Sequence, residues 1–237
     1  MISQKPWQLE ATLQLVLRLF LCFLVGAVLA TLARKWLGNQ TVEQWQLNVV
    51  IATVSMQGCG LVLIVCFLRE HNIGWLEAFN FRAGWRRALG VGLLLALAAV
   101  PATWIFQWVS VEVLTWLHYP VQTQEAIRLL QENQSPGKVI YLAVVAMVFA
   151  PLVEEMLFRG ILYPVVKQLG RPRLALWGTA IMFALMHFNA AIFLPLVFLA
   201  VMLTLLYEWT NNLLAPILVH SLFNAANFTA LYYGWVN

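Results

Sequence analysis

Two adjacent glutamates and an arginine stand in an otherwise apolar stretch of the chain, in the run from Pro151 to Gly160. Ionisable side chains are costly inside membrane helices and tend to face the interior of a helix bundle. Glu155 and Arg159 are four residues apart, on one helix face, where they can pair. Glu154 then points elsewhere, and a carboxylate without a counter-ion in its own helix is suited to act as a general base. Both glutamates could instead serve only the packing between helices.

Two histidines lie in later apolar stretches, each four residues from a second side chain of interest. Phe183 and His187 share one helix face, and so do His220 and Asn224, with Asn227 about one turn further along. Each pair also has a purely structural interpretation. Histidines near a membrane interface are common, and a histidine and an asparagine can form hydrogen bonds between neighbouring helices.

The depth of these groups in the membrane links them better than any single motif does. At a rise of about 1.5 Å per residue, Glu155, His187 and His220 lie at depths of roughly 18, 21 and 14 Å from the same predicted face. Pro151 and Pro216 each precede one of these polar groups by about one turn, where a proline opens the helical hydrogen-bond ladder. We therefore expect three helices to bring their polar groups to a similar level.

The composition predicts which fold class must position these residues. The chain has 237 residues, of which 62% are hydrophobic and 10% charged, with a mean hydropathy of +0.79. These values predict an all-α, polytopic transmembrane helical bundle. The net charge of +4 is spread between apolar blocks, so we expect no nucleic-acid partner. No aspartate occurs in the chain, which excludes the paired-aspartate intramembrane proteases.

Apolar stretches near 20 residues long predict about seven spans, with six or eight as alternatives, in a single multi-span domain over residues 1–237. Pro101 is a candidate break in the third span. Residues 69–87 are expected at the membrane surface, and residues 118–137 as a short amphipathic helix. The predicted spans cover residues 12–33, 47–68, 88–117, 138–166, 174–189, 191–208 and 213–235.

Basic residues between the spans predict the orientation. A cytoplasmic amino terminus places eight of them inside and four on the other face, so we expect this orientation, in the bacterial cell (inner) membrane. The eight are Lys5, Arg69, Arg82, Arg86, Arg87, Lys167, Arg171 and Arg173, and the four are Arg34, Lys35, Arg128 and Lys138.

The three motifs EExxxR, FxxxH and HxxxN occur in this order on separate apolar stretches, beginning at Glu154, Phe183 and His220. Together they resemble the CPBP (ABI) family of intramembrane glutamic endopeptidases, which includes the type II CAAX prenyl protease. The resemblance covers about residues 138–236, the expected catalytic core, whereas residues 1–137 resemble no family that we can name.

The resemblance implies a mechanism without a covalent intermediate. Glu154 and His187 would activate a water that attacks the scissile carbonyl. His220 and Asn224 would stabilise the oxyanion, because preorganised donors are most effective where water is scarce. The remaining motif residues, Glu155 and Arg159, would support this site.

The resemblance implies no required cofactor. Zinc is the alternative, held by Glu154, His187 and His220, but no HExxH helix is present and the three groups lie on different spans. The expected partners are the lipid bilayer and a peptide or membrane-protein substrate, whether prenylated or not.

Two other functions are compatible with the sequence. The chain could be a non-proteolytic membrane protein of the same fold, with a bacteriocin-immunity or partner-binding role. It could also be a transporter with a carboxylate and histidine relay near the midplane, although no inverted repeat is visible.

Overall fold

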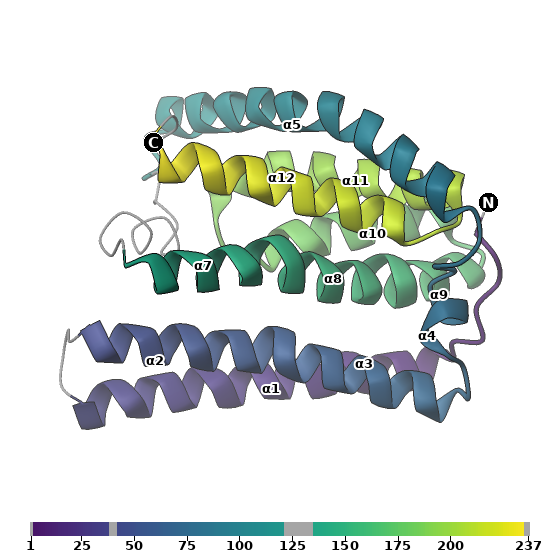
Figure 1. Cartoon of the computed structure of the whole chain (residues 1–237), viewed down its shortest axis with the longest axis horizontal. Helices are drawn as coiled ribbons and strands as arrows, with labels where there is room; N and C mark the ends of the chain where they lie inside the picture. The colour runs from purple at the N-terminus through teal and green to yellow at the C-terminus, as the bar shows by residue number, and fades with distance from the viewer. Residues whose placement is uncertain (1, 38–41, 121–134, 235–237) are drawn as a thin grey trace. The chain divides into compact units, whose positions relative to one another are not determined.

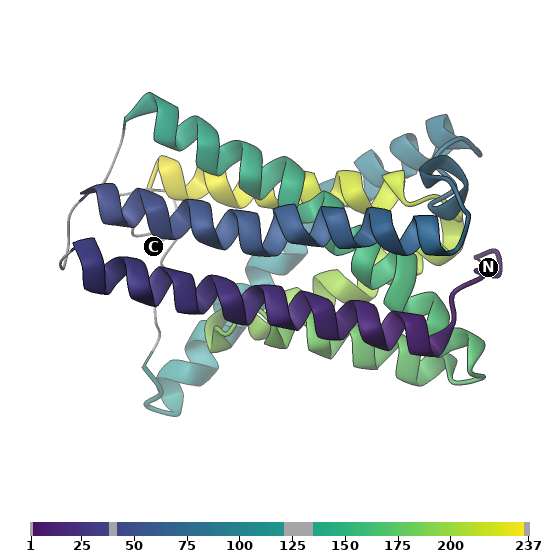
Figure 2. The same ribbon diagram turned by 90° about the horizontal axis from the view of Figure 1, so that it is seen from below.

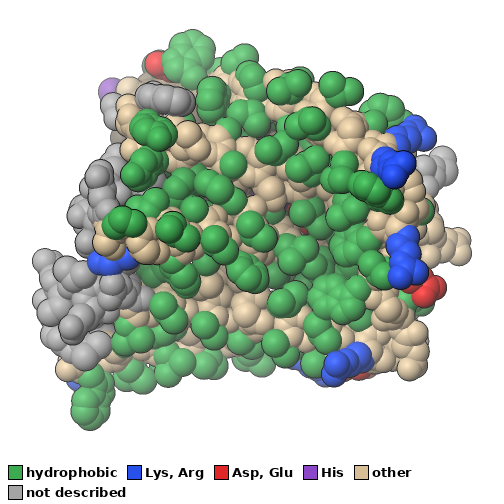
Figure 3. Space-filling view, in the orientation of Figure 1, with side chains coloured by type: hydrophobic (Ala, Val, Ile, Leu, Met, Phe, Trp, Pro, Cys, Tyr) green, Lys and Arg blue, Asp and Glu red, His purple; other side chains and the backbone are tan. Residues whose placement is uncertain are grey.

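The computed structural model describes residues 2–37, 42–120 and 135–234, and the regular secondary structure in these ranges is helical. Within them, six helices are long and apolar enough to cross a membrane. Figure 3 shows apolar side chains covering the exposed helix faces, whereas Lys and Arg gather near helix ends. The predicted all-α, multi-span membrane bundle is therefore confirmed.

The six candidate spans fall at the lower end of the predicted range of six to eight. The span expected over residues 174–189 is the one that does not qualify, because α10 (Pro172–Leu185) has only 14 residues. Such a helix is about 21 Å long, shorter than the roughly 30 Å hydrocarbon core of a bilayer. The six are Leu9–Ala33, Leu47–Glu70, Trp85–Trp116, Pro136–Gln168, Ala190–Thr210 and Leu214–Tyr232.

Contacts divide the chain into two compact units, Pro6–Ala78 and a larger one of Met1–Lys5 with Phe79–Asn237. The single domain expected over residues 1–237 stays a prediction. In the smaller unit two helical rods lie side by side (Figure 2). Gly26 permits this approach, because a Cβ there would lie 2.2 Å from Ser55 Oγ. The rods are α1 (Leu9–Leu37) and the succession α2 (Val42–Thr53), η1 (Val54–Gly58) and α3 (Cys59–Glu70), followed by α4 (Trp75–Ala78).

The larger unit is a bundle in which α5 packs along α12, α10 packs along α11, and a third rod packs against α12 (Figure 1). The backbones of α5 and α12 approach closely at Gly92, where a Cβ would lie 3.1 Å from the Ala215 carbonyl oxygen. The span containing α11 is the most buried. These helices are α5 (Trp85–Trp116), α10, η4 (Ala190–Ile192), α11 (Phe193–Thr210) and α12 (Leu214–Tyr232).

The third rod changes its helical register twice. A π-helical stretch precedes the short α-helical segment that contains Pro151, and another precedes the segment that contains Pro164. A proline lacks the N–H of the α-helical ladder and clashes with the preceding turn, and a π-turn widens the helix at such a point. The rod comprises α7 (Pro136–Val144), η2 (Val145–Phe149), α8 (Ala150–Glu155), η3 (Met156–Leu162) and α9 (Tyr163–Gln168).

The predicted effect of Pro151 agrees with this geometry, but that of Pro216 does not. Pro216 is the third residue of α12, where a backbone N–H has no partner within the helix and its loss opens nothing. Pro101 also does not break its span, since α5 continues through it.

One of the two predicted connectors can be compared with the structure, and it differs from its prediction. In residues 69–87, the expected surface helix, the structure has a four-residue helix, α4, and the start of α5. Of residues 118–137, the expected amphipathic helix, residues 121–134 lie outside the described part of the chain. Asn212 is fully buried and donates to the carbonyls of Phe81 and Ala83, which links the segment before α5 to the start of α12.

Candidate active site

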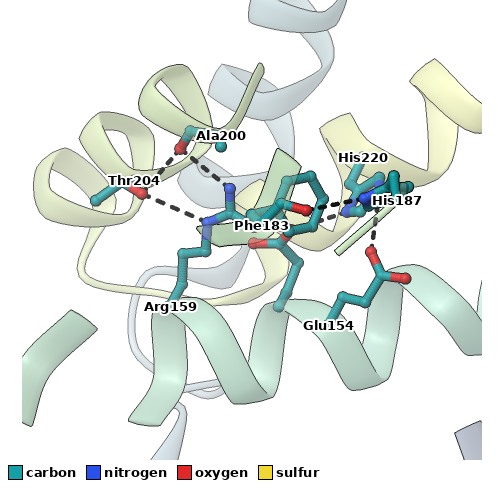
Figure 4. Close-up of polar contacts among 8 residues, drawn as sticks. Glu154, Arg159, Phe183, His187, Ala200, Thr204 and His220 are labelled. Atoms are coloured by element: carbon teal, nitrogen blue, oxygen red, sulfur yellow. Dashed lines mark hydrogen bonds and ion pairs between the residues drawn. The ribbon is translucent and has the colours of Figure 1, made fainter. Parts of the chain in front are cut away.

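Three buried polar side chains form a hydrogen-bonded chain between α8, η3 and α12 (Figure 4). Arg159 Nη1 donates to Glu155 Oε1 at 2.7 Å, which confirms the predicted pair. His220 Nδ1 lies 2.8 Å from the same oxygen. An ionised carboxylate can only accept hydrogen bonds, so the imidazole must carry its proton on Nδ1. Glu155 therefore fixes the orientation of His220 and leaves Nε2 for other partners.

Glu154 faces that second ring nitrogen. Its Oε2 lies 3.8 Å from His220 Nε2, and in Figure 4 the carboxylate points toward the imidazole. The distance is longer than a direct hydrogen bond, and Glu154 Oε2 has no hydrogen-bond partner among the described residues. The Glu154 side chain is 27% exposed, against 0% for Glu155. The two neighbouring glutamates thus have different environments, one sealed in the core and one partly accessible.

His187 lies in the turn that follows α10, and the residue is exposed. Its Nδ1 is 2.8 Å from the Phe183 carbonyl oxygen, which requires the proton on Nδ1 and leaves Nε2 as an acceptor in the neutral ring. The Phe183 ring contacts both imidazoles, with centroid distances of 5.0 Å to His187 and 5.7 Å to His220. The structure therefore brings both predicted histidines to one aromatic ring.

The other face of the site is formed by residues that the sequence did not single out. The Arg159 guanidinium lies 4.9 Å from the Phe183 ring centroid, and its Nη2 donates to the Ala200 carbonyl at 3.0 Å. Its Nε donates to Thr204 Oγ1 at 3.4 Å. Thr204 is buried on α11. In the sequence, the one feature that could have pointed to Thr204 is its hydroxyl within a strongly apolar span.

Asn224 also lies at this level of α12, but its amide contacts the rod rather than a histidine. Its Nδ2 donates to the Ala146 carbonyl oxygen at 2.7 Å. Asn227, the third polar group of that helix face, accepts a hydrogen bond from Trp104 Nε1 at 3.0 Å and donates to the Phe223 carbonyl. Asn227 therefore links α12 to α5.

The arrangement offers little support for a metal. Within the described residues, no three His, Cys, Asp or Glu side chains are grouped so that they could hold a metal ion. Glu154, His187 and His220, the alternative zinc ligands, are among the residues described. The expectation that no cofactor is required stays a prediction.

Comparison with known proteins shows a similarity between this part of the chain and one family. Residues 136–226 match the family model described as type II CAAX prenyl endopeptidase Rce1-like. The match covers less than half of the chain, and over that segment the chain is similar to the Rce1-like family. This confirms the resemblance found in the sequence. The predicted site residues all lie within the matched segment: Glu154, Glu155, Arg159, His187, His220 and Asn224.

One similar protein is the uncharacterized protein YpbD of Bacillus subtilis (strain 168), which is 34% identical to this chain over 76 residues. The alignment covers 30% of this chain and 36% of YpbD, so it spans about a third of that relative's length. No solved structure matches the chain.

Proposed function

We propose that this Rce1-like protein is an intramembrane endopeptidase that hydrolyses a peptide bond with water activated by Glu154. The proposal is supported most directly by the placement of Glu154 Oε2 at 3.8 Å from His220 Nε2, at the end of the chain formed by Arg159, Glu155 and His220. This puts a partly accessible carboxylate beside an imidazole of fixed orientation. A general base and a hydrogen-bond donor on either side of one carbonyl are what peptide hydrolysis requires.

The first step uses Glu154 as the base. A water held by Glu154 attacks the scissile carbonyl carbon and transfers a proton to the carboxylate, and His187 Nε2 helps to orient that water. The carbonyl π electrons move to oxygen, which becomes an oxyanion. His220 donates to it from Nε2 in the imidazolium form, and Asn224 donates from its amide. Such donors in a water-poor site stabilise the transition state more than the ground state.

The second step releases the products. The C–N bond breaks, and Glu154 passes its proton to the leaving amine, which regenerates the carboxylate. One product carries a new carboxyl group and the other a new amino group. No bond forms between protein and substrate at any stage.

The buried pair of Glu155 and Arg159 acts through His220. Glu155 lies 2.8 Å from His220 Nδ1, which orients the ring so that Nε2 faces the oxyanion. Arg159 compensates the buried charge of Glu155, because an isolated ion in the core is strongly unfavourable. Both are therefore positioning residues, whereas Glu154 contacts the reacting atoms.

The substrate is a peptide or membrane protein that reaches the site from the bilayer or its surface. We propose that the protein works in the bacterial cell membrane with its amino terminus in the cytoplasm, the orientation that the basic loops favour. A prenylated chain end and an unprenylated segment are both candidate substrates, and they can be compared directly.

The test is cleavage by purified protein in detergent micelles. Quenched fluorescent peptides should include one with a farnesylated cysteine near its carboxyl end and the same peptide without the lipid. The proposal predicts internal cleavage of at least one peptide, identified by mass spectrometry, with loss of cleavage in Glu154→Gln and retention in Glu112→Gln. Glu112 is exposed on α5 and serves as the matched control.

A partner-binding protein of the same fold would give a different result. No peptide would be cut by either form, while a phenotype of the gene in cells would survive Glu154→Gln. That combination would overturn the peptidase and favour the non-proteolytic alternative.

A further inference from the structure

The π-helical stretch η2 has a specific consequence for the backbone next to Pro151. The N–H of Ala150 bonds to the carbonyl of Val145, five residues earlier, rather than to that of Ala146. The next residue in register, five after Ala146, is Pro151, which has no N–H to donate. Neither the α-helical nor the π-helical pattern therefore supplies a backbone donor to the Ala146 carbonyl.

That carbonyl is the group to which Asn224 donates, at 2.7 Å from Nδ2. A carbonyl oxygen accepts but cannot donate, so the nitrogen side of the carboxamide must face it. The contact uses one of the two amide protons and leaves the second, together with the side-chain oxygen, in fixed directions. It also satisfies an acceptor that would otherwise lack a partner in the protein.

We infer that Pro151 and the π-turn before it are a positioning device for Asn224. They free the Ala146 carbonyl, and this carbonyl then sets the rotation of the carboxamide. The inference rests on the proposed function for its catalytic meaning, since Asn224 is there a donor to the oxyanion. The hydrogen bond itself does not depend on that proposal.

A double-mutant cycle tests the coupling without any assay of activity. In the presence of Pro151, Asn224→Ala leaves the Ala146 carbonyl unpaired, and we expect the thermal midpoint in detergent to fall by about 2–6 °C. In Pro151→Ala a backbone N–H becomes available to that carbonyl, so the same Asn224→Ala change should lower the midpoint by less than half as much. Equal decreases in the two backgrounds would overturn the inference.

A second measurement needs only the natural proline. Ala146 and Met147 form the only Ala–Met step in the chain, so protein labelled with carbonyl-13C alanine and 15N methionine gives a single HNCO signal, from the Ala146 carbonyl. Loss of its hydrogen bond in Asn224→Ala and Asn224→Asp should shift this signal upfield. Asn227→Ala, one turn along α12, should leave it in place. An unchanged signal in the Asn224 variants would contradict the inference even if Pro151→Ala does not fold.

Enzyme kinetics can distinguish a role of Pro151 in positioning Asn224 from a role in the stability of the fold. With whichever peptide the protein cleaves, Pro151→Ala should lower kcat by about tenfold or more and leave KM nearly unchanged, because only the transition state uses the donor. Pro164→Ala, the same change at the other π-to-α junction of the rod, should not lower kcat to that extent. Equal losses of kcat in Pro151→Ala and Pro164→Ala would contradict the inferred role of Pro151. Absence of cleavage by the variants and by the unmodified protein would instead count against the proposed function alone.

Discussion

His220 and Glu155, 65 positions apart in the chain, share a hydrogen bond of 2.8 Å between Nδ1 and Oε1. Through this bond α12 is tied to α8 at the carboxylate that Arg159 also holds. The imidazole thus has one nitrogen committed to a buried carboxylate and the other turned to Glu154. In the proposed mechanism the adjacent glutamates have separate roles, since Glu155 orients His220 and Glu154 acts as the base.

Glu155→Gln should destabilise the fold strongly, because the buried guanidinium of Arg159 loses its counter-ion. Breaking a buried ion pair from one side costs about 3–5 kcal/mol, which can be measured as the free energy of unfolding in a mixed-micelle titration with SDS. Removing both charges in Glu155→Gln/Arg159→Met should cost less than the single change. The control is Glu208→Gln, which alters the less buried pair with Lys167 and should cost less than half as much. Equal losses of unfolding free energy in Glu155→Gln and Glu208→Gln would show that Arg159 does not need Glu155 as its counter-ion.

Thr204→Val should lower stability by removing the hydroxyl that accepts from Arg159 Nε. We expect a loss of about 1–2 kcal/mol. Thr179→Val is the matched control, because both hydroxyls are buried and donate to a carbonyl four residues earlier in their own helix, but only Thr204 contacts the arginine. Equal effects of the two substitutions on unfolding would mean that the Arg159 contact contributes nothing.

Gly160→Ala should overpack the contact between η3 and the segment before α5. A Cβ at Gly160 would lie 2.5 Å from Cε1 of Phe79, and such overpacking typically costs about 1–3 kcal/mol. Gly90→Ala, in the interior of α5, is the control, because a Cβ there would meet no heavy atom within 4 Å. At this position alanine should stabilise the helix by up to about 1 kcal/mol. Similar changes of the same sign in both variants would contradict this assignment, and Phe79→Leu should relieve the Gly160→Ala defect.

Phe183→Leu should impair activity more than folding. The ring contacts both imidazoles and the guanidinium. Leucine would still fill the apolar space, but the two imidazoles and the guanidinium would each lose their contact with the ring. We expect stability to fall by roughly 1–2 kcal/mol and cleavage by more than tenfold, seen mainly in kcat. Phe106→Leu, which alters the aromatic contact with Phe198 between α5 and α11, should cause a similar loss of stability with little loss of kcat.

Local spacing predicted part of this site correctly. The pairing of Glu155 with Arg159 follows from four-residue spacing on one helix, and it is confirmed. The match of polar groups in depth also placed Glu155 and His220 at a similar level, and their side chains lie within hydrogen-bond distance, at 2.8 Å. Both predictions use only helical geometry, which depends little on how helices pack.

The sequence could not predict relationships that depend on how helices rotate against each other. The bond between His220 and Glu155 requires a particular rotation of α12 relative to α8, and the contact of Arg159 with Thr204 requires one of α11. The sequence also did not predict the hydrogen-bond partner of Asn224. This partner, the Ala146 carbonyl, becomes available through a π-turn and not through the side-chain pattern. The expected fifth span is shorter than predicted because α10 ends at Leu185 and the chain turns at His187 instead of continuing the helix.

The central claim is that Glu154 is the base, and the most direct test is the initial rate of peptide cleavage by Glu154→Gln under saturating substrate. Gln has nearly the same shape but cannot take a proton from water, so the rate should fall by roughly a hundredfold to ten-thousandfold at a thermal midpoint close to that of the unmodified protein. A rate within a fewfold of the unmodified protein, from a folded sample free of contaminating protease, would contradict the account.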